Sequence, residues 1–69
     1  MTPIDLQIGH KIRTKRRQLG VAQANLAKKL SISPSYLNLI ESGKRKINVD
    51  LLLKLKLKMF LLISKDLQE

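Results

Sequence analysis

Three short signals divide this chain into brief helical segments. Gly20 and Gly43 are each placed to end a helix, because glycine tolerates the left-handed conformation found just past a helix C-terminus. Ser33-Pro34 marks a helix start, since a serine hydroxyl caps the first turn and proline fits its first position. Apolar residues between these signals recur every three to four residues, which is the helical period. We therefore expect short helices joined by tight connections, which leaves few possible topologies.

Three helices are expected before Gly43. The first begins with Thr2 as its N-cap and runs to about Leu19, the second covers about 23–30, and the third covers about 34–42. The second follows Ala22, a poor cap, and therefore depends on tertiary packing. The side chains expected to face inward are Ile4, Ile8, Ile12 and Leu19 in the first helix, Leu26, Ala27 and Leu30 in the second, and Leu37 and Ile40 in the third.

The segment after Gly43 carries two conflicting patterns. Residues 53–59 read L-K-L-K-L-K-M, and this strict alternation is typical of a strand. A helical stripe made of Leu52, Leu55, Met59 and Leu62 fits the same segment. Asn48 is a good helix cap, and the rest of the chain is helical, so we predict a helix here. The fold class expected is a compact all-α domain of four to five helices, and residues 1–69 form one domain.

The charge of the chain indicates a polyanionic partner. It has 14 Lys and Arg against 5 Asp and Glu, a formal net charge of +9. Ten of the basic residues lie between Lys11 and Lys46, where Glu41 is the only acid. A surplus this local favours binding to nucleic acid or to an anionic membrane.

Other function classes find little support in the sequence. There is no cysteine, and His10 is the only histidine, which argues against a disulfide or a zinc site. No Ser/His/Asp set, carboxylate pair or glycine-rich phosphate loop is visible, so we expect no enzyme, no cofactor, no metal and no small-molecule substrate. The apolar run 59–63 is too short for a transmembrane segment, and no signal peptide is visible. We expect a cytoplasmic, nucleoid-associated protein of bacterial or phage type.

Two short helices joined by a tight turn, in a basic helical domain, predict a helix-turn-helix over about 23–42. The sequence resembles the lambda-repressor/Cro-like family from Ile8 to about Leu55. The residues that carry the resemblance are Ile8-Gly9, Ile12-Arg13, Arg16, Gln23, Leu26-Ala27, Leu30, Ile32-Ser33, Ser35-Tyr36-Leu37, Ile40-Glu41 and Gly43-Lys44. The chain departs from that family at Ser31, where glycine is usual, at Ala22, where serine or threonine is usual, and after Leu55.

The third helix is the expected reader of DNA bases, because a helix fits the major groove and its exposed N-terminal side chains reach base edges. Asn38 can pair two ways with an adenine edge, and Leu39 can touch a thymine methyl group. Ser33 is also needed as a cap, Tyr36 could instead pack over the turn, and Leu39 could be merely exposed. The predicted base-reading residues are Ser33, Ser35, Tyr36, Asn38 and Leu39.

Phosphate contacts are expected to position the domain without reading sequence. The resemblance implies that Gln23 holds a phosphate with its side chain and backbone N–H, and that the loop after Gly43 grips the backbone. The predicted phosphate-binding residues are Gln23, Lys44, Arg45, Lys46 and Arg13.

Arg16 and Glu41 are expected to form a structural ion pair. Arg16 falls four residues after Ile12 and Glu41 four after Leu37, so both lie on inner helical faces. A buried charge needs a partner, and Glu41 is the only acid in this part of the chain. The family resemblance supports the same pair, which would tie the first helix to the third.

The C-terminal segment, 48–69, is expected to mediate a homodimer. As a helix it has a second apolar face that one small domain cannot cover, and a second copy would bury it. The residues of this predicted dimer interface are Leu53, Leu57, Phe60 and Leu61.

The sequence thus favours a transcriptional regulator, a repressor, that binds specific double-stranded DNA as a homodimer, with helix 34–42 in the major groove. Two alternatives remain. The Lys/Leu tail alone fits a cationic amphipathic protein of the membrane surface. The same fold also suits an antitoxin-like module that binds another protein.

Overall fold

The computed structural model describes residues 3–67, with side chains described as far as Leu61. All regular secondary structure in this part of the chain is helical, which confirms the all-α class. The helices are α1 (Pro3–Gln18), α2 (Gln23–Lys29), α3 (Pro34–Glu41) and α4 (Val49–Leu67). The cap predicted at Thr2 lies outside the described residues.

Two of the predicted helix caps are confirmed. The Ser33 hydroxyl accepts a hydrogen bond from the Tyr36 backbone N–H at 3.0 Å, and Pro34 occupies the first position of α3. Asn48 Oδ1 accepts from the Leu51 backbone N–H at 2.7 Å at the start of α4. Ala22 makes no side-chain cap bond, so α2 begins without this support. The connections before α3 and before α4 are therefore each fixed by a local side-chain hydrogen bond.

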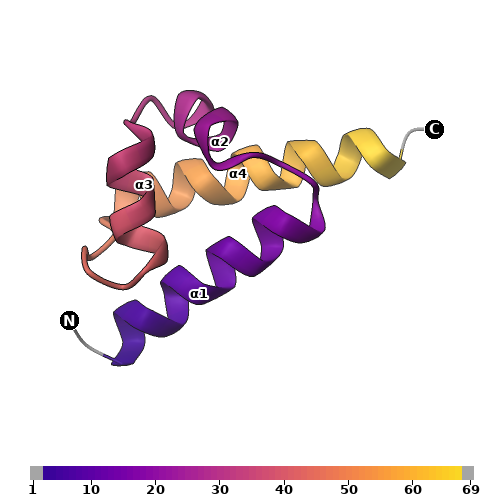
Figure 1. Cartoon of the computed structure of the whole chain (residues 1–69). Coiled ribbons are helices and arrows are strands. Elements are labelled where there is room, and N and C mark those ends of the chain that lie inside the picture. Colours follow the sequence, from indigo (N-terminus) through magenta and orange to yellow (C-terminus); the bar gives the residue numbers. More distant parts are fainter. Residues whose placement is uncertain (1–2, 68–69) are drawn as a thin grey trace.

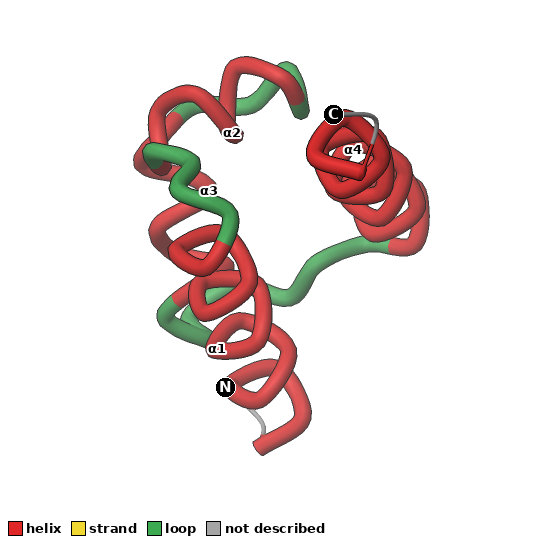
Figure 2. Tube along the Cα trace, turned by 90° about the vertical axis from the view of Figure 1, so that its right-hand side faces the viewer, coloured by secondary structure: helices red, strands yellow, loops and turns green. Residues whose placement is uncertain are grey.

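The Lys/Leu alternation in the C-terminal segment belongs to a helix, as the sequence predicts. A helix satisfies its own backbone hydrogen bonds, whereas a strand needs a neighbouring strand. In the tube of Figure 2, α4 lies on one side of the molecule and α1, α2 and α3 lie on the other. In Figure 1, the last turns of α4 extend beyond the other helices.

The core lies between α4 and the other three helices. Leu26, Leu37 and Ile40 are almost completely buried at its centre. The eight buried apolar residues are Ile12, Leu26, Ala27, Leu30, Leu37, Ile40, Leu51 and Leu55. Helices α2 and α3 form a helix-turn-helix, and α3 packs between α1 and α2.

Two expectations for the core are wrong. Ile4 is 67% exposed, whereas Leu6, two residues further along the helix, lies beside Gly43. In α4 the inner stripe begins at the buried Leu51, whereas the predicted Leu52 is only half-buried. Leu51 precedes Leu55 by four residues and Leu52 precedes it by three, and both spacings fit one helix face. Periodicity alone therefore could not distinguish the two registers.

The close approach of α1 to α3 depends on the absence of a side chain at Gly9. A Cβ at this position would overlap the backbone carbonyl oxygens of Ile40 and Glu41. Backbone oxygens at the end of α3 cannot move aside as a flexible side chain can. Gly9 therefore lets the two helices touch at the level of the Glu41 backbone.

Ser31 occupies a backbone conformation that usually favours glycine. Its φ is +59°, in the left-handed region, within the turn between α2 and α3. A residue with a Cβ is strained there by about 1–2 kcal/mol. The turn geometry is thus retained even though the glycine usual in the resembling family is replaced by serine.

We predict that Gly9→Ala lowers the free energy of unfolding by about 1–3 kcal/mol, because α1 must move away from α3 to admit the methyl group. Urea denaturation monitored by circular dichroism measures this change. His10→Ala, at the exposed neighbouring position, is the control and should leave stability nearly unchanged. Equal stabilities for Gly9→Ala and the wild type would contradict the close approach.

Candidate nucleic-acid interface

A buried carboxylate joins α1 to α3. Glu41 is 1% exposed, and its Oε2 accepts a hydrogen bond from Arg16 Nε at 2.8 Å. Arg16 Nη2 donates to Oε1 of the same carboxylate at 3.1 Å, which makes the pair bidentate. Arg16 Nη1 also donates to the Val21 carbonyl at 2.9 Å. One guanidinium thus holds α1, α3 and the α1–α2 connection together.

Two further side chains donate to the same carboxylate. Arg13 Nε lies 3.3 Å from Glu41 Oε1, and Gln23 Nε2 lies 3.2 Å from it. Burial by itself raises the pKa of Glu41, but the hydrogen bonds from Arg16, Gln23 and Arg13 and the attraction of the Arg16 charge outweigh it, so the pKa lies below its ordinary value. No buried side-chain nitrogen or oxygen among the described residues lacks a partner.

The outer face of α3 is polar and bordered by the start of α2. Ser35 and Asn38 are exposed, and Asn38 Oδ1 accepts from Gln23 Nε2 at 3.4 Å. Ser33 is exposed as well, with its hydroxyl engaged in the helix cap. Leu39 is half-buried, so it offers less surface than the predicted thymine contact assumes. The exposed part of this face therefore has hydrogen-bonding rather than apolar character.

Tyr36 lies on a different side of α3 from Asn38. Its ring is half-buried against the core, and the Arg45 guanidinium carbon sits 5.7 Å from the ring centre, within range of a cation–π contact. The ring borders a hollow at the start of α4 that is also lined by Leu30, Ile32, Asn48, Asp50, Leu51 and Lys54. Packing accounts for much of the ring, as the alternative interpretation of Tyr36 assumed.

The basic loop after Gly43 is anchored on the end of α3. The backbone N–H groups of Lys44 and Arg45 both donate to the Leu39 carbonyl, at 2.9 and 3.2 Å. The side chains of Lys44, Arg45 and Lys46 are all exposed. Three cationic groups thus stand at the C-terminal end of the helix whose outer face carries Ser35 and Asn38.

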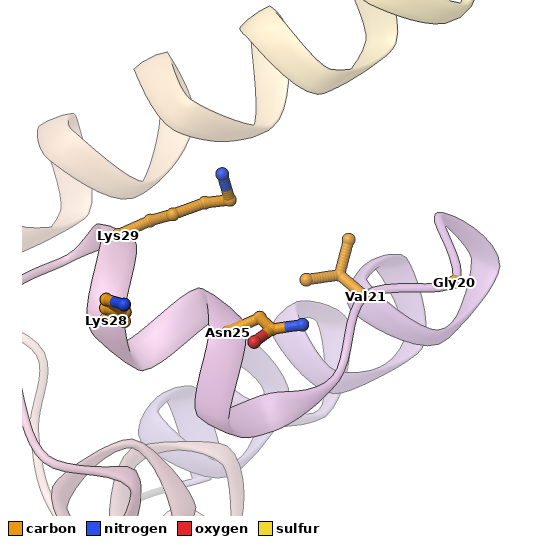
Figure 3. A pocket seen from close by; sticks show the side chains of 5 residues that line it. All are labelled: Gly20, Val21, Asn25, Lys28 and Lys29. Carbon is orange, nitrogen blue, oxygen red and sulfur yellow. The ribbon is translucent and has the colours of Figure 1, made fainter.

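A separate hollow lies along α2 and the connection before it, and Figure 3 shows it from close by. In that view Val21 and Lys29 extend toward the space beside α4. The hollow is lined by Gly20, Val21, Asn25, Lys28 and Lys29. None of the five is among the predicted DNA-contacting residues, and together they contain no nucleophile paired with a base.

The second apolar face of α4 is exposed. Phe60 is 62% and Leu53 61% exposed, and Leu57 and Leu61 are more than half exposed. None of the four lies among the residues of the core cluster.

Residues 3–67 contain no group of three or more His, Cys, Asp or Glu that could hold a metal ion. None of the helices, over the same described residues, is long and apolar enough to cross a membrane.

This helix-turn-helix is held by a buried ion pair, and its second helix has an exposed polar face beside a basic loop. Such an arrangement is typical of a class of small DNA-binding domains. Residues 12–55 match the helix-turn-helix family, and the chain belongs to this family in its Cro/lambda-repressor-like form. The family consists of non-enzymatic, DNA-binding transcriptional regulators.

Among curated proteins, the chain is similar to the HTH-type transcriptional regulator RamB in two strains of Mycobacterium tuberculosis. It is 46% identical to each over 48 residues. The match covers 70% of this chain and 10% of each relative, so the chain matches about a tenth of their length. No solved structure matches the chain.

Sequence reasoning paired Arg16 with Glu41 but did not place Arg13 or Gln23 on the same carboxylate. Both had been assigned to DNA phosphate, and neither lies on the apolar stripe of its helix. The sequence does carry a signal for these extra contacts. Glu41 is a single acid among ten basic residues, and one carboxylate can accept hydrogen bonds from more than one donor. Arg16 binds the Val21 carbonyl and so holds the turn that precedes α2. Gln23 follows this turn, and its side-chain amide lies within hydrogen-bonding distance of Glu41.

We predict that the domain loses stability as the pH falls below the ordinary glutamate pKa of 4.5. The pKa of Glu41 is lower in the folded than in the unfolded chain, so its stabilising contribution is present above the unfolded pKa and is lost as the pH falls through the folded pKa. Chemical denaturation at a series of pH values measures the loss.

Glu41→Gln should be less stable at neutral pH and show a shallower acid dependence. Asp50→Asn, at an exposed position, is the control and should retain most of the acid dependence. An unchanged pH slope in Glu41→Gln would show that other carboxyl groups govern acid stability.

Proposed function

We propose that this domain binds specific duplex DNA as a transcriptional repressor, with α3 in the major groove. The observation that carries the proposal is the exposed polar face of α3, with Ser35 and Asn38, beside the exposed cationic loop 44–46. Backbone hydrogen bonds from Lys44 and Arg45 to the Leu39 carbonyl hold the loop against the end of α3. A helix with polar side chains and a flanking basic loop matches the base edges and phosphates of a major groove.

In this proposal the residues divide by role. Ser35 and Asn38 read base edges, and Ser33 contributes from the helix start while it serves as cap. Lys44, Arg45 and Lys46 neutralise phosphates and set the register of α3 in the groove. The stacking of Arg45 on Tyr36 supports a phosphate-side role for this pair. The phosphate contact predicted for Gln23 rests on the family resemblance.

The proposed repression needs only occupancy of the site. A protein that fills a major groove excludes other proteins from the same site, and this needs no surface beyond the reader itself. The relatives named as transcriptional regulators support a regulatory role. Because they are about ten times longer than the matched segment, any further activity of such proteins is not carried over to this chain.

We also propose that two copies pair through α4. The occupant we propose for its exposed apolar face is the same face of a second chain, because a two-fold axis pairs identical patches. Lys54 and Lys56 flank these leucines and can extend their charges to the rim of the interface. Such a dimer would present two α3 helices to one side of the duplex, where successive major grooves are about 34 Å apart.

We predict that Lys44→Gln weakens binding to all duplex sequences alike and lowers the slope of log affinity against log salt by about one unit. Fluorescence anisotropy with a selected duplex and a random duplex, over a range of salt, measures both effects. Lys28→Gln, exposed at the hollow of Figure 3, is the matched control. An unchanged slope would remove the loop from the interface.

The same assay with anionic vesicles tests the membrane-surface alternative. The proposed function requires tighter binding to a selected duplex than to random DNA. Binding to vesicles with no preference among duplexes would favour the alternative, which the Lys/Leu pattern of α4 supports.

We predict that the wild type is a dimer at micromolar concentration and that Leu57→Glu/Leu61→Glu is a monomer, because two carboxylates would lie in the apolar interface. Sedimentation equilibrium distinguishes the two states. Gln7→Glu/Gln18→Glu makes the same charge change at exposed positions of α1 and should remain dimeric. A monomeric wild type at high micromolar concentration would rule out pairing through this face.

A further inference from the structure

The two amide side chains at the reading surface form a chain of hydrogen bonds with the buried carboxylate. Gln23 Nε2 lies 3.2 Å from Glu41 Oε1 and 3.4 Å from Asn38 Oδ1. The series runs from the interior, through the start of α2, to the exposed face of α3. Each member can be assigned as donor or acceptor from the chemistry of its neighbours alone.

Glu41 sets the polarity of this series. An ionised carboxylate can only accept hydrogen bonds, so the Gln23 group that faces it must be the amide nitrogen rather than the oxygen. The arginine bonds favour the ionised form, because Arg16 and Arg13 are both donors to this carboxylate. The Gln23 amide therefore cannot flip without placing its oxygen against the carboxylate.

The orientation of the Gln23 amide in turn determines the orientation of the Asn38 amide. An amide nitrogen has two N–H groups, and Gln23 directs one to Glu41 and the other to Asn38. Because this second group is also a donor, Asn38 must turn its oxygen toward it. The NH₂ group of Asn38 is then left on the exposed side of α3.

We infer that Glu41, acting through Gln23, makes Asn38 a hydrogen-bond donor toward DNA, so that it selects guanine over adenine. Guanine presents two acceptors, N7 and O6, in the major groove, whereas adenine presents one acceptor beside an N6 donor. An outward NH₂ group matches the former and opposes the N6 group of the latter. This differs from the sequence-based expectation, in which Asn38 pairs two ways with adenine and needs its oxygen free.

The inference rests on the proposed function and makes Gln23 and Glu41 positioning residues for specificity. Both side-chain N–H groups of Gln23 are directed to Glu41 and Asn38, so the phosphate contact implied for Gln23 is left to its backbone N–H. Truncating Gln23 would release the Asn38 amide, which could then turn either edge to the base. The expected mark of this arrangement is a loss of discrimination at one base pair, with the other base pairs read as before.

The experiment is selection of bound sequences from a random duplex pool, repeated with three chains. Asn38→Ala identifies the base pair that Asn38 reads, as the position where preference disappears. At that position the wild type should prefer guanine over adenine by at least about fivefold, in line with one base-edge contact. Gln23→Ala should reduce this ratio to less than about twofold and leave the ratios at other positions unchanged.

A second measurement uses only the wild type, since Gln23→Ala also removes a donor from the buried carboxylate. Replacing the guanine at this position by 7-deazaguanine removes the N7 acceptor and should weaken binding by about threefold or more. No change on this replacement would overturn the donor assignment.

Other results separate the inference from the proposed function. Selection of adenine at the Asn38 position, or an unchanged guanine preference in Gln23→Ala, would overturn the inference while DNA binding stands. Asn38→Ala with every preference intact would remove Asn38 from the reading set and overturn it too. Failure of the wild type to enrich any duplex would overturn the proposed function and with it this inference.

Discussion

The fold depends on one buried negative charge. Glu41 is removed from water at the end of α3, and an isolated carboxylate in that position would cost several kcal/mol. Donors from Arg16, Arg13 and Gln23 compensate it, and they come from α1 and from the start of α2. The carboxylate thus connects α1, α3 and the start of α2 at one point. Apolar packing fills the space between the helices, but it does not by itself specify these positions.

Local signals in the sequence predicted the helix boundaries well because each acts within one turn. Ser33-Pro34 and Asn48 start α3 and α4 through bonds to backbone N–H groups three residues later. The Arg16–Glu41 pair was also within reach of sequence reasoning, because both residues lie on inner faces and only one acid was available. In each case a short-range rule left one solution.

The remaining features depend on three-dimensional placement that periodicity does not encode. Ile4 continues the spacing of Ile8 and Ile12, but no element covers it. The role of Gln23 depends on the turn held by Arg16, which brings an amide from another helix to Glu41. Tyr36 is half-buried and Asn38 is exposed because they point to different sides of α3. Two residues of helical rotation are enough to separate a core-facing side chain from an outward one.

The absence of a side chain at Gly9 has a consequence for the proposed complex with DNA. The backbone of α1 touches the carbonyl groups at the end of α3, and the charged contacts of Glu41 lie at the same point. If α3 enters a major groove as proposed, this close contact would limit how far the helix can tilt or slide. Part of the mutual adjustment would then fall to the duplex, through bending or a change of groove width. Sequences that deform easily would be favoured even at base pairs that no side chain touches.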